Sequence, residues 1–322
     1  MTPSSPGLRP PQAREVPLAE ALGLAPGMLA RSEATGEAYL TASVVRGPAV
    51  ILGAGQRAGR VLQLDACAAA STPVYRRTTS GTAAYLGEQG ILWTLALPRV
   101  DWIFPDASMR TLLNRNVRPF LRGLRRAAGA PAHYFGRDWI SMAHRPVALL
   151  GFEVSPRGAV LIEVIAGVDA PLAIPAALAT AEEHAVDRWL GKAPAALADL
   201  MKADAPTVAR TVMEAVVAAS ASPIADAPPS PPRALVPVRD AASPSTSSLV
   251  PGPGLRVPIG WLDTGIDPAT GDVWLGGDAL VPAYVYRGVA LGEELAAEVA
   301  VEGASLADLH DAVRRVRATV EA

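Results

Sequence analysis

Short apolar runs of strand length alternate with segments of helical periodicity through most of the chain. The runs at residues 49–52 and 91–97 are bounded by glycine and proline, a combination typical of buried strands. Two further runs, at 147–154 and 159–167, flank the tetrapeptide Ser-Pro-Arg-Gly, where proline in second place and glycine in fourth favour a reverse turn. These two runs predict a β-hairpin.

Helical periodicity is strongest between residues 105 and 129. One apolar face is formed there by Leu112, Leu113, Val117, Phe120, Leu121 and Leu124. Pro119 falls inside this pattern and should kink or split the helix. Further helical stretches are expected at about 176–190, 194–203 and 206–219. This succession predicts an α/β or α+β body built on a mixed sheet with flanking helices.

Composition divides the chain into four parts. Residues 1–17 are rich in proline and serine and predict a disordered tail. Residues 221–255 are dominated by alanine, proline and serine, which predicts a linker, because such a segment buries too little apolar surface to fold. The main domain is therefore expected at 18–220 and a small C-terminal unit at 256–322.

The C-terminal unit is expected to be α+β. Strands are predicted at 273–275 and 284–287, and a helix should begin at Ser305, which has a capping-box spacing with Asp308. The tripeptide Asp263-Thr264-Gly265 resembles the Asp-Thr-Gly of aspartic proteases. A unit of this size is small for that fold, so we interpret the tripeptide as a turn.

Overall charge excludes several classes of partner. Of the 322 residues 50% are hydrophobic and only 19% are charged, with a formal net charge of −2. A chain of this length can bury a large core, and its near neutrality provides no field that would attract nucleic acid or an anionic membrane. Electrostatic recognition must therefore be local. A series of arginines between 110 and 126 is either such a docking face for an acidic partner or a solvated helix face.

Cysteine and histidine usage argues against a disulfide or a metal centre. Cys67 is the single cysteine, so an intrachain disulfide and a cysteine-rich metal site are excluded, and we interpret it as a small core residue. The four histidines are scattered without the spacing of metal ligands. The N-terminus lacks the pattern of a signal peptide and no apolar run approaches a membrane span. We expect a soluble, cytoplasmic protein.

The clearest candidate chemistry is a pair of arginines followed by a loop of small residues. A guanidinium fork matches carboxylate or phosphate oxygens, and the loop Ser80-Gly81-Thr82 lets backbone N–H groups approach the same anion. Arg76 and Arg77 thus predict a cradle for an acyl-adenylate or a carrier-bound acyl group. The alternative is an arginine pair in a solvated turn.

The order of these features resembles the core of the biotin/lipoate protein ligase superfamily. Its lipoate ligases carry a strand ending in a G-x-x-Q-like turn and then an R-R-x-x-G-G-G-A-V-x-H-D box, and this chain reads PAVILGAGQ followed by VYRRTTSGTAAYLGEQG. Ser80, Gly81 and Thr82 stand at the three glycines and Leu86 at the histidine. The segment Gly136-Arg137-Asp138 resembles the family's G-R-N-D without its asparagine.

The resemblance implies a fold and a ligand site. The fold is the class II aminoacyl-tRNA synthetase/biotin ligase type, with a mixed sheet and flanking helices. The implied ligand-binding residues are Arg76, Arg77, Ser80, Gly81, Thr82, Gly136, Asp138 and Gly151.

The resemblance also implies that standard catalysis is lost. Ligases and octanoyltransferases of the superfamily place a lysine at the start of the first hairpin strand, where it stabilises developing negative charge, and Pro146 occupies that position. Arg145 and His144 are weak substitutes. Arg145 is adjacent, so it points to the opposite face of the strand, and His144 shares the face but lies a full two-residue step away. Octanoyltransferases use a nucleophilic cysteine where this chain has Ala176.

Three functions are compatible with these residues. The first is a divergent lipoate/octanoate ligase-like protein that binds an acyl ligand or a lipoyl-type carrier domain without standard catalysis. The second is an active ligase or acyltransferase that uses ATP, Mg²⁺ and lipoate or octanoate with an unusual cation. In the third, the C-terminal unit has a separate interaction function. A lysine such as Lys192 or Lys202 reaching the arginine-lined site would argue against lost catalysis.

Overall fold

The computed structural model describes residues 13–220, 224–226, 233, 235, 237–238, 249–295 and 298–319. Most of the segment predicted as tail and linker lies outside these residues. The described part of the tail contains β1 (Ala13–Glu15), which pairs in parallel with β2 (Ala38–Arg46). The last residues of the predicted linker also pair, in β12 (Val250–Pro251) and at the start of β13 (Leu255–Val257).

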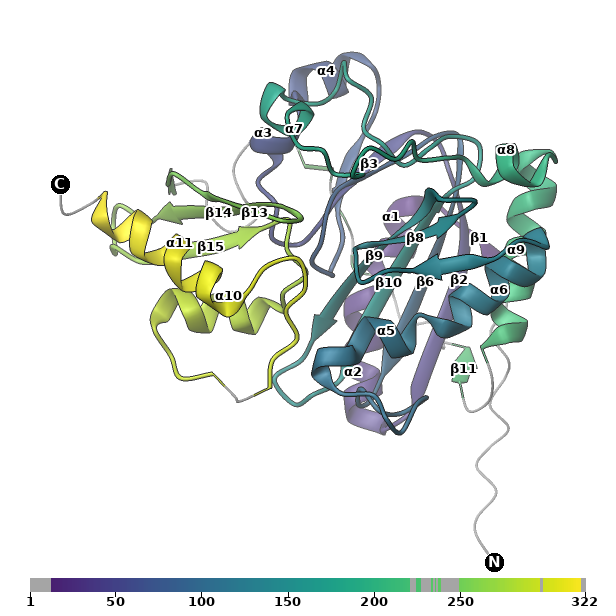
Figure 1. The fold of residues 1–322 in the computed structure, drawn as a ribbon, viewed down its shortest axis with the longest axis horizontal. Coiled ribbons are helices and arrows are strands. Elements are labelled where there is room, and N and C mark those ends of the chain that lie inside the picture. Colours follow the sequence, from purple (N-terminus) through teal and green to yellow (C-terminus); the bar gives the residue numbers. More distant parts are fainter. Residues whose placement is uncertain are drawn as a thin grey trace, which may run out of the picture.

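An eight-stranded mixed sheet forms the centre of the molecule (Figure 1). Its strand order is β1-β2-β6-β10-β9-β8-β7, with β11 (Ile224–Asp226) also paired to β2. The remaining bounds are β6 (Gln89–Leu97), β7 (Ala132–Tyr134), β8 (Trp139–Met142), β9 (Arg145–Val154) and β10 (Val160–Gly167). All neighbours from β2 to β7 are antiparallel.

Apolar residues on both faces of this sheet explain its nearly continuous apolar strands. Along β6, Ile91, Trp93 and Leu95 join the largest core cluster, whereas Leu92 belongs to a cluster on the opposite face. The first face is covered by α5 (Leu112–Asn116), α6 (Arg118–Ala128) and α9 (Ala205–Ala219). The second is covered by α1 (Leu18–Gly23), α2 (Ala25–Thr35) and a three-stranded sheet.

The three-stranded sheet carries the predicted loop. Its order is β4-β3-β5, with β3 (Ala49–Leu52) parallel to β4 (Val74–Arg76) and antiparallel to β5 (Ala84–Leu86). The turn after β3 leads into α3 (Ala58–Val61) and α4 (Leu64–Ala69). The arginine pair therefore lies at the end of β4, and Ser80 to Thr82 connect β4 with β5.

The C-terminal unit packs against one end of this body (Figure 1). It contains a four-stranded sheet of β12, β14 (Gly260–Ile266), β13 and β15 (Val273–Gly277). Two helices, α10 (Ala283–Leu291) and α11 (Leu306–Ala318), complete it. Ser305 caps α11 and exchanges hydrogen bonds with Asp308, so the predicted capping box is confirmed.

Several helix predictions require correction. Pro119 splits the helix as expected: η1 (Met109–Thr111) and α5 precede Val117, and α6 follows with the proline in its first turn. The stretch at 176–190 yields only α7 (Ala181–His184), and 194–203 only α8 (Leu197–Met201). The strand predicted at 284–287 is wrong, because these residues lie in α10, whose Val285 and Val289 are buried on one face.

Candidate functional site around the Ser80 loop

Arg77 organises the loop from within. Its side chain is 2% exposed, and Nη2 donates to the carbonyl oxygens of Ser80 and Thr82 at 3.0 and 3.1 Å, while Nε donates to that of Thr79 at 3.3 Å. Burial lowers the pKa of Arg77, and the charges of Glu163 and Asp138 partly offset that effect. Nη1 has no hydrogen-bond partner among the described residues, but Nε and Nη2 both hold backbone carbonyl groups, so Arg77 fixes the path of the loop.

Arg76 holds the other side of the site, the turn after β3. Its Nη1 donates to the carbonyl oxygens of Gly53, Ala54 and Gln56 at 2.8, 3.2 and 2.6 Å. Burial lowers its pKa to about 10, and its Nε and Nη2 have no hydrogen-bond partner among the described residues. The arginine pair thus holds two separate backbone segments, the turn after β3 and the Ser80 loop, and both side chains are largely withdrawn from solvent.

Two glycines allow the loop to lie directly on its neighbours. A Cβ at Gly53 would stand 1.9 Å from the carbonyl oxygen of Gly81. A Cβ at Gly151 would stand 2.4 Å from Thr79 Oγ1 and 2.5 Å from the carbonyl oxygen of Ser80. Contacts this short exclude any side chain at either position. Gly151 therefore contributes to the site by its lack of a side chain.

Two buried carboxylates anchor the ends of the loop. Glu163 Oε2 accepts hydrogen bonds from Thr79 N and Oγ1 at 3.0 and 2.7 Å, and Thr82 Oγ1 donates to Asp138 Oδ2. Both carboxyls are 0% exposed, and burial raises the pKa of each. Asp138 is thus brought to the predicted loop, whereas Gly136, two residues earlier, lies with open space around its Cα.

The weak catalytic candidates lie at the opposite end of β9. Six residues separate Arg145 from Gly151, a distance of about 20 Å along an extended strand. Arg145 donates from Nε and Nη2 to the carbonyl oxygens of Ala193 and Pro194 at 3.0 and 2.9 Å. His144 is exposed in the two-residue turn between β8 and β9, with φ of 62°.

Pro146 is covered by the same segment. Its carbonyl oxygen accepts from Ala195 N at 2.9 Å. The β8–β9 pairing is irregular at this point: Ile140 lies opposite Ala148 and Ser141 opposite Pro146, so Val147 is an extra residue in β9. The chain's two lysines, Lys192 and Lys202, do not line the cavity described below.

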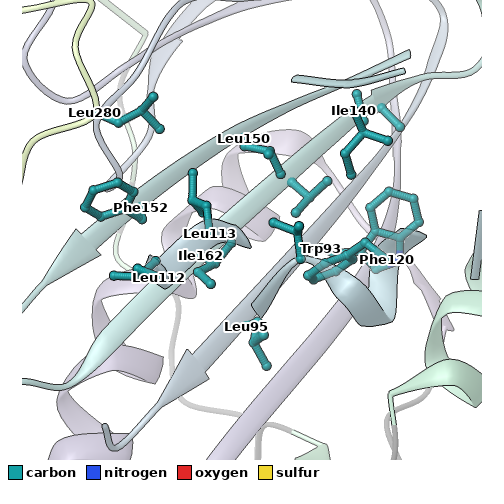
Figure 2. Packing of buried hydrophobic residues seen from close by; sticks show 14 of the residues in the cluster. Trp93, Leu95, Leu112, Leu113, Phe120, Ile140, Leu150, Phe152, Ile162 and Leu280 are labelled. Atoms are coloured by element: carbon teal, nitrogen blue, oxygen red, sulfur yellow. The ribbon is translucent and has the colours of Figure 1, made fainter. Parts of the chain in front are cut away.

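The C-terminal unit closes over the loop. Val281 N donates to Ser80 Oγ at 3.0 Å, and Ser80 Oγ donates to the carbonyl oxygen of Phe152 at 2.8 Å. Leu280 joins the central core at the same end as Phe152 (Figure 2). The loop is therefore enclosed by residues of both units.

A buried ionic cluster, which we call the clamp, fastens the two units together. It consists of Gln56, Arg60, Glu183, Arg188, Asp263 and Asp278. Arg60 pairs with Asp263 through Nε and Oδ1 at 2.8 Å and with Asp278 through Nη2 and Oδ1 at 2.7 Å. Gln56 Nε2 donates to Asp278 Oδ1 at 2.6 Å. The Asp-Thr-Gly tripeptide is therefore part of β14 and of the clamp, which overturns its interpretation as a turn.

The three carboxyls and two guanidinium groups of the clamp shift one another's pKa values in different directions. Burial alone would raise the pKa of Asp278, yet the charges of Arg188 and Arg60 hold it at about 2. For Asp263 and Glu183 burial dominates and raises the pKa. Sequence reasoning had noted Gln56 only as part of a family turn. Asp263 was noted only as part of the Asp-Thr-Gly tripeptide, and no local pattern marks Arg60, Glu183, Arg188 or Asp278.

One cavity adjoins the loop. It has a volume of about 430 Å³ and lies between the turn after β3, the loop, β15 and α10. The main domain contributes Ala54, Gly55, Ser80 and Glu153, and the C-terminal unit contributes Asp272, Val273, Trp274, Leu275, Val281, Ala283, Tyr286, Arg287, Ala290 and Leu291. Of the predicted ligand-binding residues only Ser80 lines it.

A larger cavity of about 560 Å³ adjoins Cys67. Cys67 is 2% exposed and packs in a small core with Leu62 and Val74. Burial raises the pKa of its thiol, which disfavours the thiolate needed for nucleophilic attack. Its interpretation as a core residue is confirmed.

Comparison with known proteins places this arrangement in a fold family. The P. falciparum protein LipL1 in complex with lipoate superposes with a TM-score of 0.59 at 12% identity, over 83% of this chain and 84% of that one. Lipoate-protein ligase A bound with ATP gives 0.53 at 14%, over 69% and 88%. This chain shares the fold of lipoate-protein ligase A. The predicted fold class and resemblance are confirmed.

A third similar structure contains a carrier. It is a bi-partite lipoate protein ligase and its E2 lipoyl domain from Thermoplasma acidophilum, with a TM-score of 0.51 at 15% identity over 68% of this chain and 86% of that one. No family model and no curated protein matches the sequence. None of the helices in the described residues has the length and apolar character needed to cross a membrane.

Proposed function

We propose that this protein is a divergent lipoate/octanoate ligase-like protein that binds an acyl group, free or on a lipoyl-type carrier domain, and lacks standard ligase catalysis. The binding place is the 430 Å³ cavity beside Ser80. A mostly apolar cavity that is lined by a few polar groups is the usual form of a small-molecule site. Arg76 and Arg77 contribute indirectly, because they hold the turn after β3 and the Ser80 loop, which together form one wall of the cavity.

The observation that carries the proposal is the environment of Pro146. Relatives need a lysine ammonium in contact with the acyl carbonyl or phosphate. Here Pro146 has no charge, and its carbonyl oxygen accepts a hydrogen bond from Ala195 N. The adjacent Arg145 donates its hydrogen bonds to two backbone carbonyl groups. The shared fold supports the proposal that the protein still binds an acyl ligand. The environment of Pro146 supports the proposal that it no longer catalyses acyl transfer.

A carrier-modification assay tests the proposal. The full-length protein is incubated with ATP, Mg²⁺, octanoate or lipoate and an apo lipoyl domain, and the mass of the carrier lysine is followed. We expect no mass increase, while titration calorimetry detects binding of an acyl compound to the same protein. Modification that disappears in Arg145→Ala and persists in Arg157→Ala, an exposed arginine in the β9–β10 turn, would establish the active alternative instead.

A further inference from the structure

The cavity beside Ser80 has an acid at its buried end. Glu153 follows Gly151 by two residues, so both face the loop side of β9. Its side chain is 8% exposed, and Oε1 accepts from Val154 N and Ala283 N, each at 3.0 Å. Oε2 accepts only a longer second bond of 3.2 Å from Ala283 N. That oxygen keeps acceptor capacity for a donor inside the cavity.

In the part of the chain that the structure describes, no cation balances this acid at the buried end. The charged residues that line the cavity are Glu153, Asp272 and Arg287, and the last two are exposed. Arg76 and Arg77, which the sequence had offered as the anion site, are turned to backbone carbonyl groups and do not line the cavity. A free acid entering head first would therefore meet a carboxyl group of like charge.

We infer that the cavity takes the uncharged amide of an acylated lysine, and not a free fatty or lipoic acid. The amide N–H donates to Glu153 Oε2, and the acyl chain lies against Leu275, Val281 and Ala290. This assignment rests on the proposed acyl-binding function and names the chemical form of the acyl group: the finished lysine conjugate presented by a carrier.

Size and charge both favour the conjugate. Cavities of ~300–1,000 Å³ typically hold drug-sized ligands, so about 430 Å³ accommodates an aliphatic acyl chain together with its amide. Burial raises the pKa of Glu153 to about 7, so the group is mostly ionised at pH 8 and then accepts an N–H donor while repelling a carboxylate.

Three octyl ligands that differ only in the head group test the inference. Full-length protein is titrated at pH 8 with Nε-octanoyl-lysine blocked at both ends, with octanoate and with octylamine. We expect the octanoyl-lysine amide to bind at least about tenfold more tightly than octanoate, the effect of one unit of like-charge repulsion. Glu153→Gln keeps an acceptor for Ala283 N and removes the charge, so it should reduce this ratio toward one. Glu214→Gln, at an exposed position of α9, is the control.

The possible results separate this inference from the proposed function. Octanoate binding as tightly as the amide, or depending on Arg287 in an Arg287→Ala variant, overturns the inference and leaves acyl binding intact. Tightest binding of octylamine overturns it in favour of an amine site. Failure of all three ligands overturns the inference and the proposed function together. The wild-type series requires no variant, so a misfolded Glu153→Gln protein would not prevent a decision.

Discussion

Arg60 and Asp278 form a buried ion pair across 218 residues of sequence, with 2.7 Å between Nη2 and Oδ1. Their side chains are 3% and 0% exposed. The pair belongs to the clamp that joins the turn after β3 to the C-terminal unit. Because the same turn lines the cavity, this pair connects the position of the C-terminal unit with the shape of the candidate site.

Neutralising Asp278 should destabilise the protein strongly. Asp278→Asn removes the buried ion pairs that this carboxylate forms with Arg60 and Arg188, and breaking a buried ion pair typically costs about 3–5 kcal/mol in free energy of unfolding. Urea denaturation measures it. The matched control is Arg99→Ala, which removes an exposed pair with Asp101 at 2.7 Å and should cost below about 1 kcal/mol. Equal costs would contradict the role of the clamp.

Stability should fall as Glu153 ionises. Its pKa in the folded protein is about 7, above the 4.5 of an unperturbed glutamate, so folding favours the protonated form. Its contribution to stability is therefore complete below pH 4.5 and is lost as the pH rises through 7. The lost contribution amounts to roughly 3 kcal/mol over the interval. Nearby Tyr284 and Tyr286 have raised pKa values and stay neutral throughout.

The comparison of wild type with Glu153→Gln isolates this effect. The difference in free energy of unfolding between the two proteins, measured by denaturation at several pH values, should change between pH 4.5 and 8 in favour of the variant. Glu214→Gln, which removes an exposed carboxylate on α9, is measured beside it as the control for loss of one negative charge. A Glu153→Gln difference that does not change with pH would show that the acid is not held in a desolvated place.

A methyl group at Gly53 should displace the Ser80 loop. The Cβ of Gly53→Ala would lie 1.9 Å from the carbonyl oxygen of Gly81, which is a backbone atom and cannot rotate away as a side chain could. Overpacking of this kind costs about 3 kcal/mol. Gly136→Ala, with φ of 70° and nothing within 4 Å, carries only the conformational cost of about 1–2 kcal/mol. Thermal melting of the two variants side by side checks the order, and acyl binding should be lost in Gly53→Ala alone.

The sequence predicted those strands and turns of the fold that depend on residues close together in the chain. The runs at 147–154 and 159–167 became β9 and β10 because both are apolar on two faces and are joined by a turn in which Gly158 N donates to the carbonyl oxygen of Ser155 at 2.9 Å. The strand prediction at 284–287 is wrong because its three apolar or aromatic residues, Tyr284 to Tyr286, suit a strand as well as a buried helix. The helix forms because it packs Val285 into the core.

The candidate site was harder to predict, since its residues act through long-range contacts. The sequence indicated Arg76, Arg77 and the loop correctly as neighbours, but their roles depend on carbonyl groups and glycines that only the folded chain brings near. Glu153 lies within an apolar strand, where its period-two position gives no sign of a cavity. The clamp joins residues such as Arg60 and Asp278 that share no segment, so nothing in either local sequence marked the partnership.

The basic face of α6 should determine carrier docking if the proposed function holds. Arg122, Arg125 and Arg126 are exposed, and none has an ion-pair partner among the described residues. Reversing all three to glutamate should leave the melting temperature nearly unchanged, because exposed charges contribute little to folding, and should weaken binding of an acidic lipoyl-type carrier more than tenfold at low salt. Surface plasmon resonance at two ionic strengths measures this. The control variant reverses Arg14, Arg31 and Arg157 to glutamate, which changes the net charge by the same amount at positions outside α6. Equal loss of carrier binding in both variants would show that the effect comes from overall charge and that α6 is not the docking face.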